Sequence, residues 1–418
     1  MNRFYYSVLL TLILPLVPLK LLWRGIKQPA YRQHWGERFG FYKITISKPV
    51  IWLHCVSVGE TRAAEPLINA LQATHPNHQI LLTHGTPTGR EVGEALFSDK
   101  VDRVYLPYDV PFAVNSFLKH FKPSIGLIME TELWFNLIAA CQQRDIPVLL
   151  LNARLSEKSA NGYAKLGKLA RDGLQSLSAV AAQTNDDAAR FENLGTHNIS
   201  VAGNLKFDVT PPADSLDKGL QLRKQFGERP VFLAASTRDG EEALILDALA
   251  KVNIPNLLTI LVPRHPQRFD AVTALLEQRG IHYQRKTLLN NNALKASTHL
   301  LLGDSMGEMP MYYAACDMAF IGGSLLNYGG QNLIEAAHMG KPILIGVYTF
   351  NFADASKDAV TAGAAIRVKN ADALMQDVGE LLKNKTELAN MQQAALNFSA
   401  ASAGATGRLM QVIAQHLH

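Results

Sequence analysis

The chain has 418 residues, of which 48% are hydrophobic and 18% are charged, and its formal net charge is +5. This length accommodates two domains with separate cores, and the composition excludes an intrinsically disordered chain. Cys55, Cys141 and Cys316 lie far apart in apolar contexts, so their spacing indicates buried free thiols rather than a disulfide framework or a zinc site.

The positive charge is concentrated near the N-terminus. Residues 1–50 hold eight Lys or Arg side chains and one acid, Glu37, whereas the remaining 368 residues hold 33 basic and 35 acidic side chains. Because most of the chain is slightly acidic, this distribution argues against a nucleic-acid-binding face. It favours contact with anionic lipid or with an anionic, membrane-borne substrate.

Residues 4–19 carry no charge and are followed by a basic flank that contains Trp23. This run is slightly shorter than the roughly 20 residues that a spanning helix needs, and Pro15 and Pro18 should kink it. The basic flank and the lack of a small-residue cleavage site oppose a cleaved signal peptide. We expect residues 1–25 to be a membrane anchor that spans the bilayer or lies in its interface, with the protein body on the cytoplasmic side. A helix of the protein core is the alternative.

Short apolar runs alternate with helical stretches through residues 26–210, which we expect to form an N-terminal Rossmann-like domain. This alternation predicts parallel βαβ units, and polar clusters follow most of the runs, where such sheets bind ligands. A helix is predicted over 62–73. The predicted strands are 51–56, 80–83, 101–106, 125–129, 148–151, 179–182 and 199–202.

A stretch of proline and turn residues, 210–215, marks the predicted domain boundary. A second alternating series follows, so we expect residues 211–418 to form a C-terminal Rossmann-like domain that binds a nucleotide, leaving open whether its last helix packs back on the first domain. The predicted architecture is α/β, with the two domains facing across a cleft. The strands predicted here are 231–234, 257–262, 300–302, 318–321 and 342–345.

The fourth of these strands leads into two glycine pairs, at 322–323 and 329–330, followed by Asn332 and an alanine-rich helix. Glycine permits positive φ and close approach of a ligand to the backbone, and Asn332 is a good N-cap for a helix whose start attracts anions. Glu335 would repel a phosphate, so we assign it to sugar hydroxyls. The stretch predicts either a nucleotide site or a tight strand–helix turn in which Glu335 complements the helix dipole.

Glu60 follows the first predicted strand, on the side where α/β sheets bind ligands. A carboxylate there could accept a proton from a hydroxyl nucleophile. The pattern Ser57-x-x-Glu60 is also a capping box, in which the Glu60 side chain would be purely structural. The residues alone leave both interpretations open.

Four further charged residues lie at strand ends. Glu130 and Glu132 either raise each other's pKa to supply an acid or base, or divide into one buried and one solvated carboxylate. Lys206 stabilises charge on a leaving phosphate or is a surface lysine. Arg264 binds a phosphate or forms a surface ion pair. The sequence contains no Walker loop, no GxGxxG and no Asp-x-Asp pair.

Taken in order along the chain, the polar motifs resemble those of the 3-deoxy-D-manno-octulosonic acid (Kdo) transferases. Each motif alone is weak, but the ordered set is specific and extends over nearly the whole chain. The matching motifs are Ala30-Tyr31-Arg32…Trp35-Gly36-Glu37-Arg38, His54-x-x-Ser57-Val58-Gly59-Glu60, Met129-Glu130-Thr131-Glu132-Leu133-Trp134, Asn152-Ala153-Arg154-Leu155-Ser156, Leu205-Lys206-Phe207-Asp208, Pro263-Arg264-His265-Pro266, Gly303-Asp304-Ser305-Met306-Gly307-Glu308 and Gly322-Gly323-Ser324.

This resemblance implies a GT-B glycosyltransferase that needs no metal or other cofactor. It implies transfer of Kdo from CMP-Kdo to a lipid A precursor (lipid IVA) in lipopolysaccharide biosynthesis, at the cytoplasmic face of a bacterial inner membrane. By this likeness Glu60 deprotonates the acceptor hydroxyl, while Glu130 and Lys206 stabilise the transition state. The residues implied to hold CMP are Pro263, Arg264, Met306, Gly307, Glu308, Asn332, Leu333, Ile334 and Glu335.

One segment departs from the family pattern. Family members commonly read Gly-Gly-His-Asn-Pro where this chain has Gln331 and Leu333 in the third and fifth positions. Gln331 hydrogen-bonds but cannot be a cation, and Leu333 lacks the pre-set φ of proline, so we expect a small effect on CMP affinity. The alternatives are a GT-B enzyme that uses a UDP-sugar and a non-catalytic, membrane-tethered nucleotide-binding scaffold.

Overall fold

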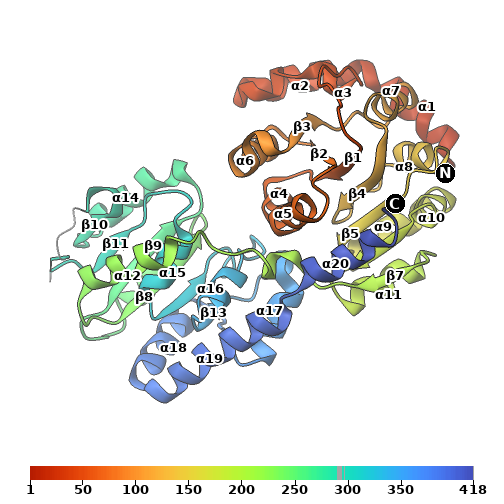
Figure 1. Cartoon of the computed structure of the whole chain (residues 1–418). Coiled ribbons are helices and arrows are strands. Elements are labelled where there is room, and N and C mark those ends of the chain that lie inside the picture. The colour runs from red at the N-terminus through yellow and green to blue at the C-terminus, as the bar shows by residue number, and fades with distance from the viewer. Residues whose placement is uncertain (290–293, 296, 418) are drawn as a thin grey trace. The chain divides into compact units, whose positions relative to one another are not determined.

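The computed structural model describes residues 1–289, 294–295 and 297–417, and the chain divides into two compact units. Unit 1 comprises Met1–Val209 and Ala403–His418, and unit 2 comprises Thr210–Ser402. Each unit is built on a seven-stranded sheet in which every described strand pair is parallel (Figure 1). The alternation of apolar runs and helical stretches in the sequence predicted this arrangement.

The sheet of unit 1 has the order β3-β2-β1-β4-β5-β6-β7. The order reverses between β1 and β4, which are direct neighbours, so their carboxyl ends flank the position where α/β sheets bind ligands. The strands are β1 (Val50–His54), β2 (Gln79–His84), β3 (Asp102–Tyr105), β4 (Pro123–Met129), β5 (Val148–Ala153), β6 (Ala179–Ala182) and β7 (Ile199–Val201).

Helices cover both faces of this sheet, which explains why its strands are almost uniformly apolar. Besides the N-terminal helices, unit 1 contains α3 (Trp35–Arg38), α4 (Val58–Ala63), α5 (Glu65–Thr74), α6 (Pro87–Phe97), α7 (Pro111–Phe121), α8 (Phe135–Gln142), α9 (Glu157–Leu166), α10 (Lys168–Gln175), α11 (Asn185–Asn193) and α20 (Ala405–Ala414). One core cluster includes apolar residues of α7, α8 and α10. The other includes residues of α4, α5 and α20, and Figure 1 shows α20 beside the orange and yellow elements of this unit.

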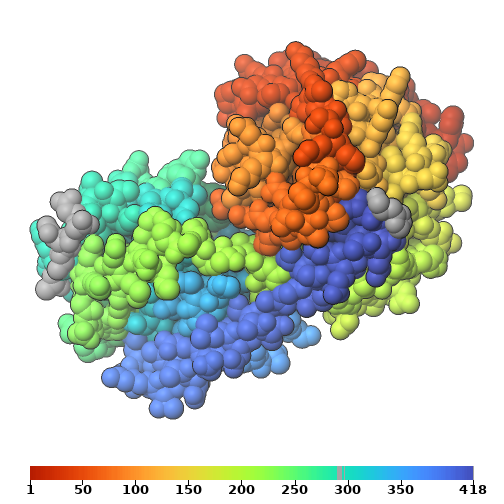
Figure 2. Space-filling model, viewed as in Figure 1, coloured from red at the N-terminus to blue at the C-terminus, as the bar shows by residue number. Residues whose placement is uncertain are grey.

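The N-terminal helices lie at the surface of unit 1 (Figure 2, red). They are α1 (Arg3–Ile13) and α2 (Val17–Lys27), separated by a 3₁₀ turn at Leu14–Leu16 that contains Pro15, close to the predicted kink. Two hydrogen bonds attach α1 to the body: the Tyr6 hydroxyl donates to Asp109 at 2.9 Å, and the Ser7 hydroxyl donates to Asn136 at 2.8 Å. Large apolar side chains on the outer side are exposed, among them Phe4, Leu12, Leu16, Leu19, Trp23 and Ile26.

The sheet of unit 2 has the order β10-β11-β9-β8-β12-β13-β14. Its strands are β8 (Val231–Thr237), β9 (Leu258–Pro263), β10 (Tyr283–Arg285), β11 (Leu300–Leu302), β12 (Met318–Ile321), β13 (Ile343–Ile345) and β14 (Ala365–Arg367). Its helices are α12 (Ser215–Phe226), α13 (Glu241–Leu249), α14 (Phe269–Gln278), α15 (Met309–Ala315), α16 (Ile334–His338), α17 (Ala353–Thr361), α18 (Ala371–Lys383) and α19 (Lys385–Ser402).

The structure differs from the sequence predictions at one helix of unit 1 and at two edge strands of unit 2. The single helix predicted over 62–73 is wrong, because the helix begins four residues earlier at Val58 and breaks into α4 and α5, with Pro66 in the first turn of α5. The edge strands β10 and β14 were not predicted. Each is only three residues long and partly exposed, so neither shows a continuous apolar run.

Gly322 is required by packing between strands. A Cβ at this position would lie 2.6 Å from the Cα of Thr237 and in contact with the carbonyl oxygen of Ser236, both at the end of neighbouring β8. These atoms are backbone and cannot rotate away, so any side chain would force β8 and β12 apart. Gly323 follows with φ +73°, a conformation that favours glycine.

We therefore expect Gly322→Ala to lower the unfolding free energy by about 2 kcal/mol or more, because the new methyl group overpacks a rigid contact. The matched control is Gly162→Ala inside α9, where a Cβ would meet nothing within 4 Å. That change should raise stability by up to about 1 kcal/mol through helix propensity. Urea unfolding monitored by circular dichroism measures both, and equal stability of the two variants would contradict the assignment.

Candidate active site

Glu60 lies in the first turn of α4, directly after β1 and the loop that follows it. Ser57 is the N-cap of this helix, and its hydroxyl accepts from the Glu60 N–H at 3.4 Å. The same hydroxyl donates to Glu60 Oε1 at 2.9 Å, and the Val56 N–H donates to Glu60 Oε2 at 2.6 Å. The Glu60 side chain thus takes part in capping, as one of the two interpretations predicted, and both of its oxygens have a defined position.

Burial, followed by the nearby charge of Glu130, raises the pKa of Glu60 to about 7, against the opposing effect of the bonds from Val56 and Ser57. Burial, followed by the charge of Glu130, likewise raises the pKa of Glu132 to about 7. A carboxylate that titrates near neutral pH can accept and release a proton under physiological conditions. Capping therefore does not exclude a role in proton transfer, because these two features coexist at one residue.

Glu130 begins the turn after β4 and has φ +58°, which is uncommon for a residue with a side chain. Its N–H donates to the carbonyl of Leu151 at 2.9 Å, and its Oε1 lies 3.7 Å from Lys206 Nζ. Lys206 lies in a 3₁₀ turn, Leu205–Phe207, and is half-buried. The structure thus brings Glu60, Glu130, Glu132 and Lys206 together at the carboxyl ends of the unit 1 strands.

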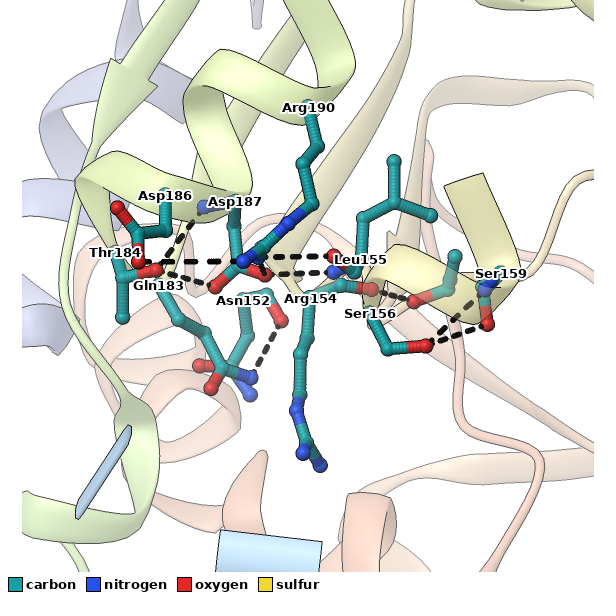
Figure 3. Close-up of polar contacts among 11 residues, drawn as sticks. Asn152, Arg154, Leu155, Ser156, Ser159, Gln183, Thr184, Asp186, Asp187 and Arg190 are labelled. Carbon is teal, nitrogen blue, oxygen red and sulfur yellow. Dashed lines mark hydrogen bonds and ion pairs between the residues drawn. The ribbon is translucent and has the colours of Figure 1, made fainter. Parts of the chain in front are cut away.

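The loops after β5 and β6 form a polar network next to this cluster (Figure 3). Asp187 is buried, accepts from the Leu155 N–H at 2.8 Å and lies 3.5 Å from Arg190. Arg154 points away from this pair in Figure 3, and its carbonyl accepts from the hydroxyl of Thr131, in the turn after Glu130.

Three residues of this region, Asn152, Gln183 and Asn204, were assigned no role from the sequence, although Asn152 begins one of the matching motifs. Asn152 lies at the end of β5, and Gln183 and Asn204 follow β6 and β7. The Gln183 side chain binds the Asn152 carbonyl and the Asn204 side chain, and the side chains of Asn152 and Asn204 bind backbone N–H groups of the Lys206 turn. The available signal was their position, since each is a polar amide placed just at or after the carboxyl end of an apolar strand.

In unit 2, the candidate residues of the β9 loop contact the glycine-rich stretch. The Arg264 N–H donates to the carbonyl of Thr237 at 2.9 Å, and its Nε donates to Gln331 Oε1 at 3.1 Å. Gln331 therefore holds Arg264 through a neutral acceptor. Arg238 adds a further cation, because it lies 2.7 Å from His265 Nε2 and 4.7 Å from the ring of Tyr328.

The loop after β11 carries the other candidate residues. Met306 is exposed, Gly307 has φ +80°, and Glu308 precedes α15. Lys286 Nζ donates to both carboxylate oxygens of Glu308, at 2.8 and 2.7 Å, and the Ser305 hydroxyl donates to one of them. The side chain of Glu308 is thus an acceptor held beside a cation.

The helix that we expected to begin at Asn332 begins at Ile334 and has only five residues. Asn332 Oδ1 accepts from the Ile334 N–H at 3.1 Å, and its Nδ2 donates to Glu335 Oε1 at 3.0 Å. Leu333 is the residue before the helix. Because a helix this short sums few peptide dipoles, the anion attraction predicted from its N-terminus is weak. Gly329 and Gly330 have φ +86° and +76°, as their residue type predicted.

The described residues contain no evident set of metal ligands. No group of three or more His, Cys, Asp or Glu side chains among them is arranged to hold an ion. Arg264, Arg238, Lys206 and Lys286 are cations of the candidate regions that could contact a phosphate or carboxylate.

Comparison with known proteins identifies relatives over the whole chain. A family model described as 3-deoxy-D-manno-octulosonic-acid transferase matches residues 33–209, and one described as glycosyl transferases group 1 matches residues 270–398. The chain is 40% identical to a 3-deoxy-D-manno-octulosonic acid transferase of Bordetella pertussis, covering 99% of both chains. It is 38% identical to the protein of that name from Haemophilus influenzae, covering 100% of this chain and 99% of that one. A solved glycosyltransferase from Rickettsia africae, 14% identical, aligns over 89% of this chain and 99% of its own with a TM-score of 0.62, which shows the shared fold.

We expect the carboxyl of Glu60 to titrate with a pKa of about 7, and Glu130→Gln to lower that pKa because a neighbouring negative charge is removed. Carbon-13 NMR of labelled glutamate carboxyls, assigned with Glu60→Gln, measures the shift. Glu157→Gln, at an exposed position in α9, is the control and should leave the titration unchanged.

The same pKa has a consequence for stability. The pKa of Glu60 is higher in the folded chain, about 7, than the ordinary value of 4.5. Protonation of Glu60 therefore stabilises the folded chain. This stabilisation is complete below pH 4.5 and is lost as the pH rises through about 7. A Glu60 carboxyl that titrates near 4.5 in the wild-type protein would contradict both expectations.

Proposed function

The chain belongs to the 3-deoxy-D-manno-octulosonic acid transferases, and we propose that it moves Kdo from CMP-Kdo to a hydroxyl of a lipid A precursor, with Glu60 as the base. The observation that carries this proposal is the Glu60 carboxyl, which is fixed at the end of β1 and has a pKa of about 7. Kdo transfer in lipopolysaccharide biosynthesis is the activity of this glycosyltransferase family.

In the proposed reaction, Glu60 takes the proton of the acceptor hydroxyl as that oxygen bonds to the anomeric carbon of Kdo. The bond from this carbon to the phosphate oxygen of CMP breaks, and CMP leaves with the electron pair. The Val56 N–H and the Ser57 hydroxyl hold both Glu60 oxygens, yet each oxygen keeps further lone pairs for the incoming proton. Positioning of the base and the acceptor supplies much of the rate enhancement.

Glu130 and Lys206 act on charge in this reaction. We assign Lys206 to negative charge that develops on the donor carboxylate or the leaving phosphate, since a preorganised cation stabilises such charge strongly. Glu130 Oε1 lies 3.7 Å from the Lys206 ammonium and orients it. Glu130 also raises the pKa of Glu60, which makes Glu60 a stronger base.

The donor nucleotide is assigned to unit 2. Arg264, oriented by Gln331, offers the planar donor group that suits a phosphate. Glu335 and Glu308 supply acceptors for ribose hydroxyls and for the amino group of cytosine. The remaining assigned residues, Pro263, Met306, Gly307, Asn332, Leu333 and Ile334, provide backbone groups and apolar contact.

We expect Glu60→Gln to reduce Kdo transfer by about 10²- to 10⁴-fold, because the amide keeps the capping geometry but accepts no proton. Binding of CMP-Kdo, measured by calorimetry, should stay unchanged because the residues assigned to the nucleotide lie in unit 2. The matched control is Glu65→Gln, at the first residue of α5, and this variant should transfer Kdo at the normal rate. Near-normal turnover by the Glu60 variant would reduce Glu60 to a capping residue.

The N-terminal helices support an interfacial attachment to the membrane. Among the described residues, one stretch, Arg3–Lys27, is long and apolar enough to cross a bilayer. Its first part is attached sideways to the body through Tyr6 and Ser7, and Gly25 in its last part is buried against the side chain of Arg32. Because α1 is bonded sideways to the body and α2 packs against the turn that follows it, we infer that α1 and α2 lie along the membrane surface, with their exposed apolar side chains in the lipid.

Cysteine labelling in sealed inner-membrane vesicles tests this inference, because the three native thiols are buried. A cysteine at residue 2 should react with a membrane-impermeant maleimide from the same side as a cysteine at the exposed position 158 of α9, the matched control. A helix that spans the bilayer would place residue 2 on the opposite side, and labelling from that side alone would refute the interfacial arrangement.

A further inference from the structure

Three amide side chains connect the strand ends of unit 1 to the turn that carries Lys206. We propose that Asn152, Gln183 and Asn204 are positioning residues that set the Lys206 ammonium opposite Glu130. This inference rests on the role of Lys206 in the proposed function and adds to it a chain of residues that touch no substrate.

The hydrogen bonds form a continuous path. Asn152 Oδ1 accepts from the Leu205 N–H at 3.0 Å, and Gln183 Nε2 donates to the Asn152 carbonyl at 2.9 Å (Figure 3). Gln183 Oε1 accepts from Asn204 Nδ2 at 3.0 Å, and Asn204 Oδ1 accepts from the Lys206 N–H at 3.0 Å. The backbone N–H groups of residues 205 and 206 are therefore both bound by this set of side chains.

The same path also sets the position of Glu130. The Glu130 N–H donates to the carbonyl of Leu151, the residue immediately before Asn152. Asn152 thus directly follows the residue whose carbonyl binds Glu130, and its side chain binds the turn that carries Lys206. Glu130 Oε1 and Lys206 Nζ lie 3.7 Å apart. A shift of this segment would change the distance between the two charges.

The conformation of Asn152 separates its side-chain role from its backbone role. Asn152 is fully buried with φ +51°, a region that glycine and asparagine enter at least cost. A glycine would satisfy the backbone equally well, but it would leave the buried Leu205 N–H without its acceptor. The asparagine therefore supplies a contact that the turn geometry alone does not require.

The first experiment compares Asn152→Gly with Asn198→Gly. Asn198 also has positive φ, +55°, and also makes a side-chain bond, to the Ser178 carbonyl, but it lies at the amino-terminal edge of the sheet, before β7. We expect Asn152→Gly to lower kcat for Kdo transfer by about 10- to 100-fold with the KM for CMP-Kdo within twofold, because the orientation of Lys206 relative to Glu130 changes and the residues assigned to the nucleotide do not. Asn198→Gly should keep wild-type kcat. Equal kcat values in folded samples of the two variants would overturn the proposal.

A second pair covers the case in which Asn152→Gly fails to fold. Asn204→Asp keeps the acceptor for the Lys206 N–H, whereas Asn204→Ala removes it. We expect Asn204→Asp to retain at least several-fold more kcat than Asn204→Ala. If both lose kcat equally, the bond to the Lys206 turn has no positioning effect.

Combination with Lys206→Met distinguishes this inference from the proposed function. If Asn152 acts through Lys206, Asn152→Gly should cost little further kcat once the ammonium is gone, so the two losses should not add. If the two losses of kcat add fully, the positioning role of Asn152 is overturned and the proposed role of Lys206 is not. Wild-type transfer by Lys206→Met would instead refute the proposed role of Lys206.

Discussion

Two hydrogen bonds to one carboxylate organise the candidate chemistry of this protein. The Val56 N–H and the Ser57 hydroxyl fix Glu60 where β1 ends and α4 begins, and they do so inside a buried, acidic neighbourhood. The bonds favour the charged form, and burial with the charge of Glu130 favours the neutral form. Because these opposing effects leave the pKa near 7, a group that caps a helix is also able to exchange a proton.

Unit 2 uses a buried carboxylate for a different purpose. Glu241 accepts from the backbone N–H groups of Arg238, Gly323 and Leu325, and so joins the loop after β8 to the glycine-rich stretch. Arg264 and Gln331 belong to the segments that this contact holds in register. The phosphate-binding geometry assigned to Arg264 therefore depends on a glutamate that was not singled out in the sequence, since no local pattern marks a carboxylate that bonds residues more than 80 positions away.

The sequence predicted both parallel sheets and the strand ends at which polar residues gather, because buried parallel strands are continuous apolar runs and their order constrains the chain. It also predicted the capping contacts of Glu60, which the structure confirms, whereas the role of Glu60 as a base stays a prediction. It did not predict the amide path through Asn152 and Gln183, nor the positive φ of Glu130, because these depend on contacts between loops that are distant in sequence. The start of α16 was predicted two residues too early, since Asn332 accepts from the next residue but one and binds Glu335 rather than opening the helix itself.

The return of α20 to unit 1 makes that unit discontinuous along the chain. Ala405, Leu409 and Ile413 of α20 are fully buried in a core whose other members were synthesised more than 180 residues earlier. During translation all of unit 2 must therefore emerge before unit 1 can close its second layer. Until then the part of this core that α20 covers stays exposed beside α4 and α5, so the order of synthesis imposes a late docking step on a unit that is first in the chain.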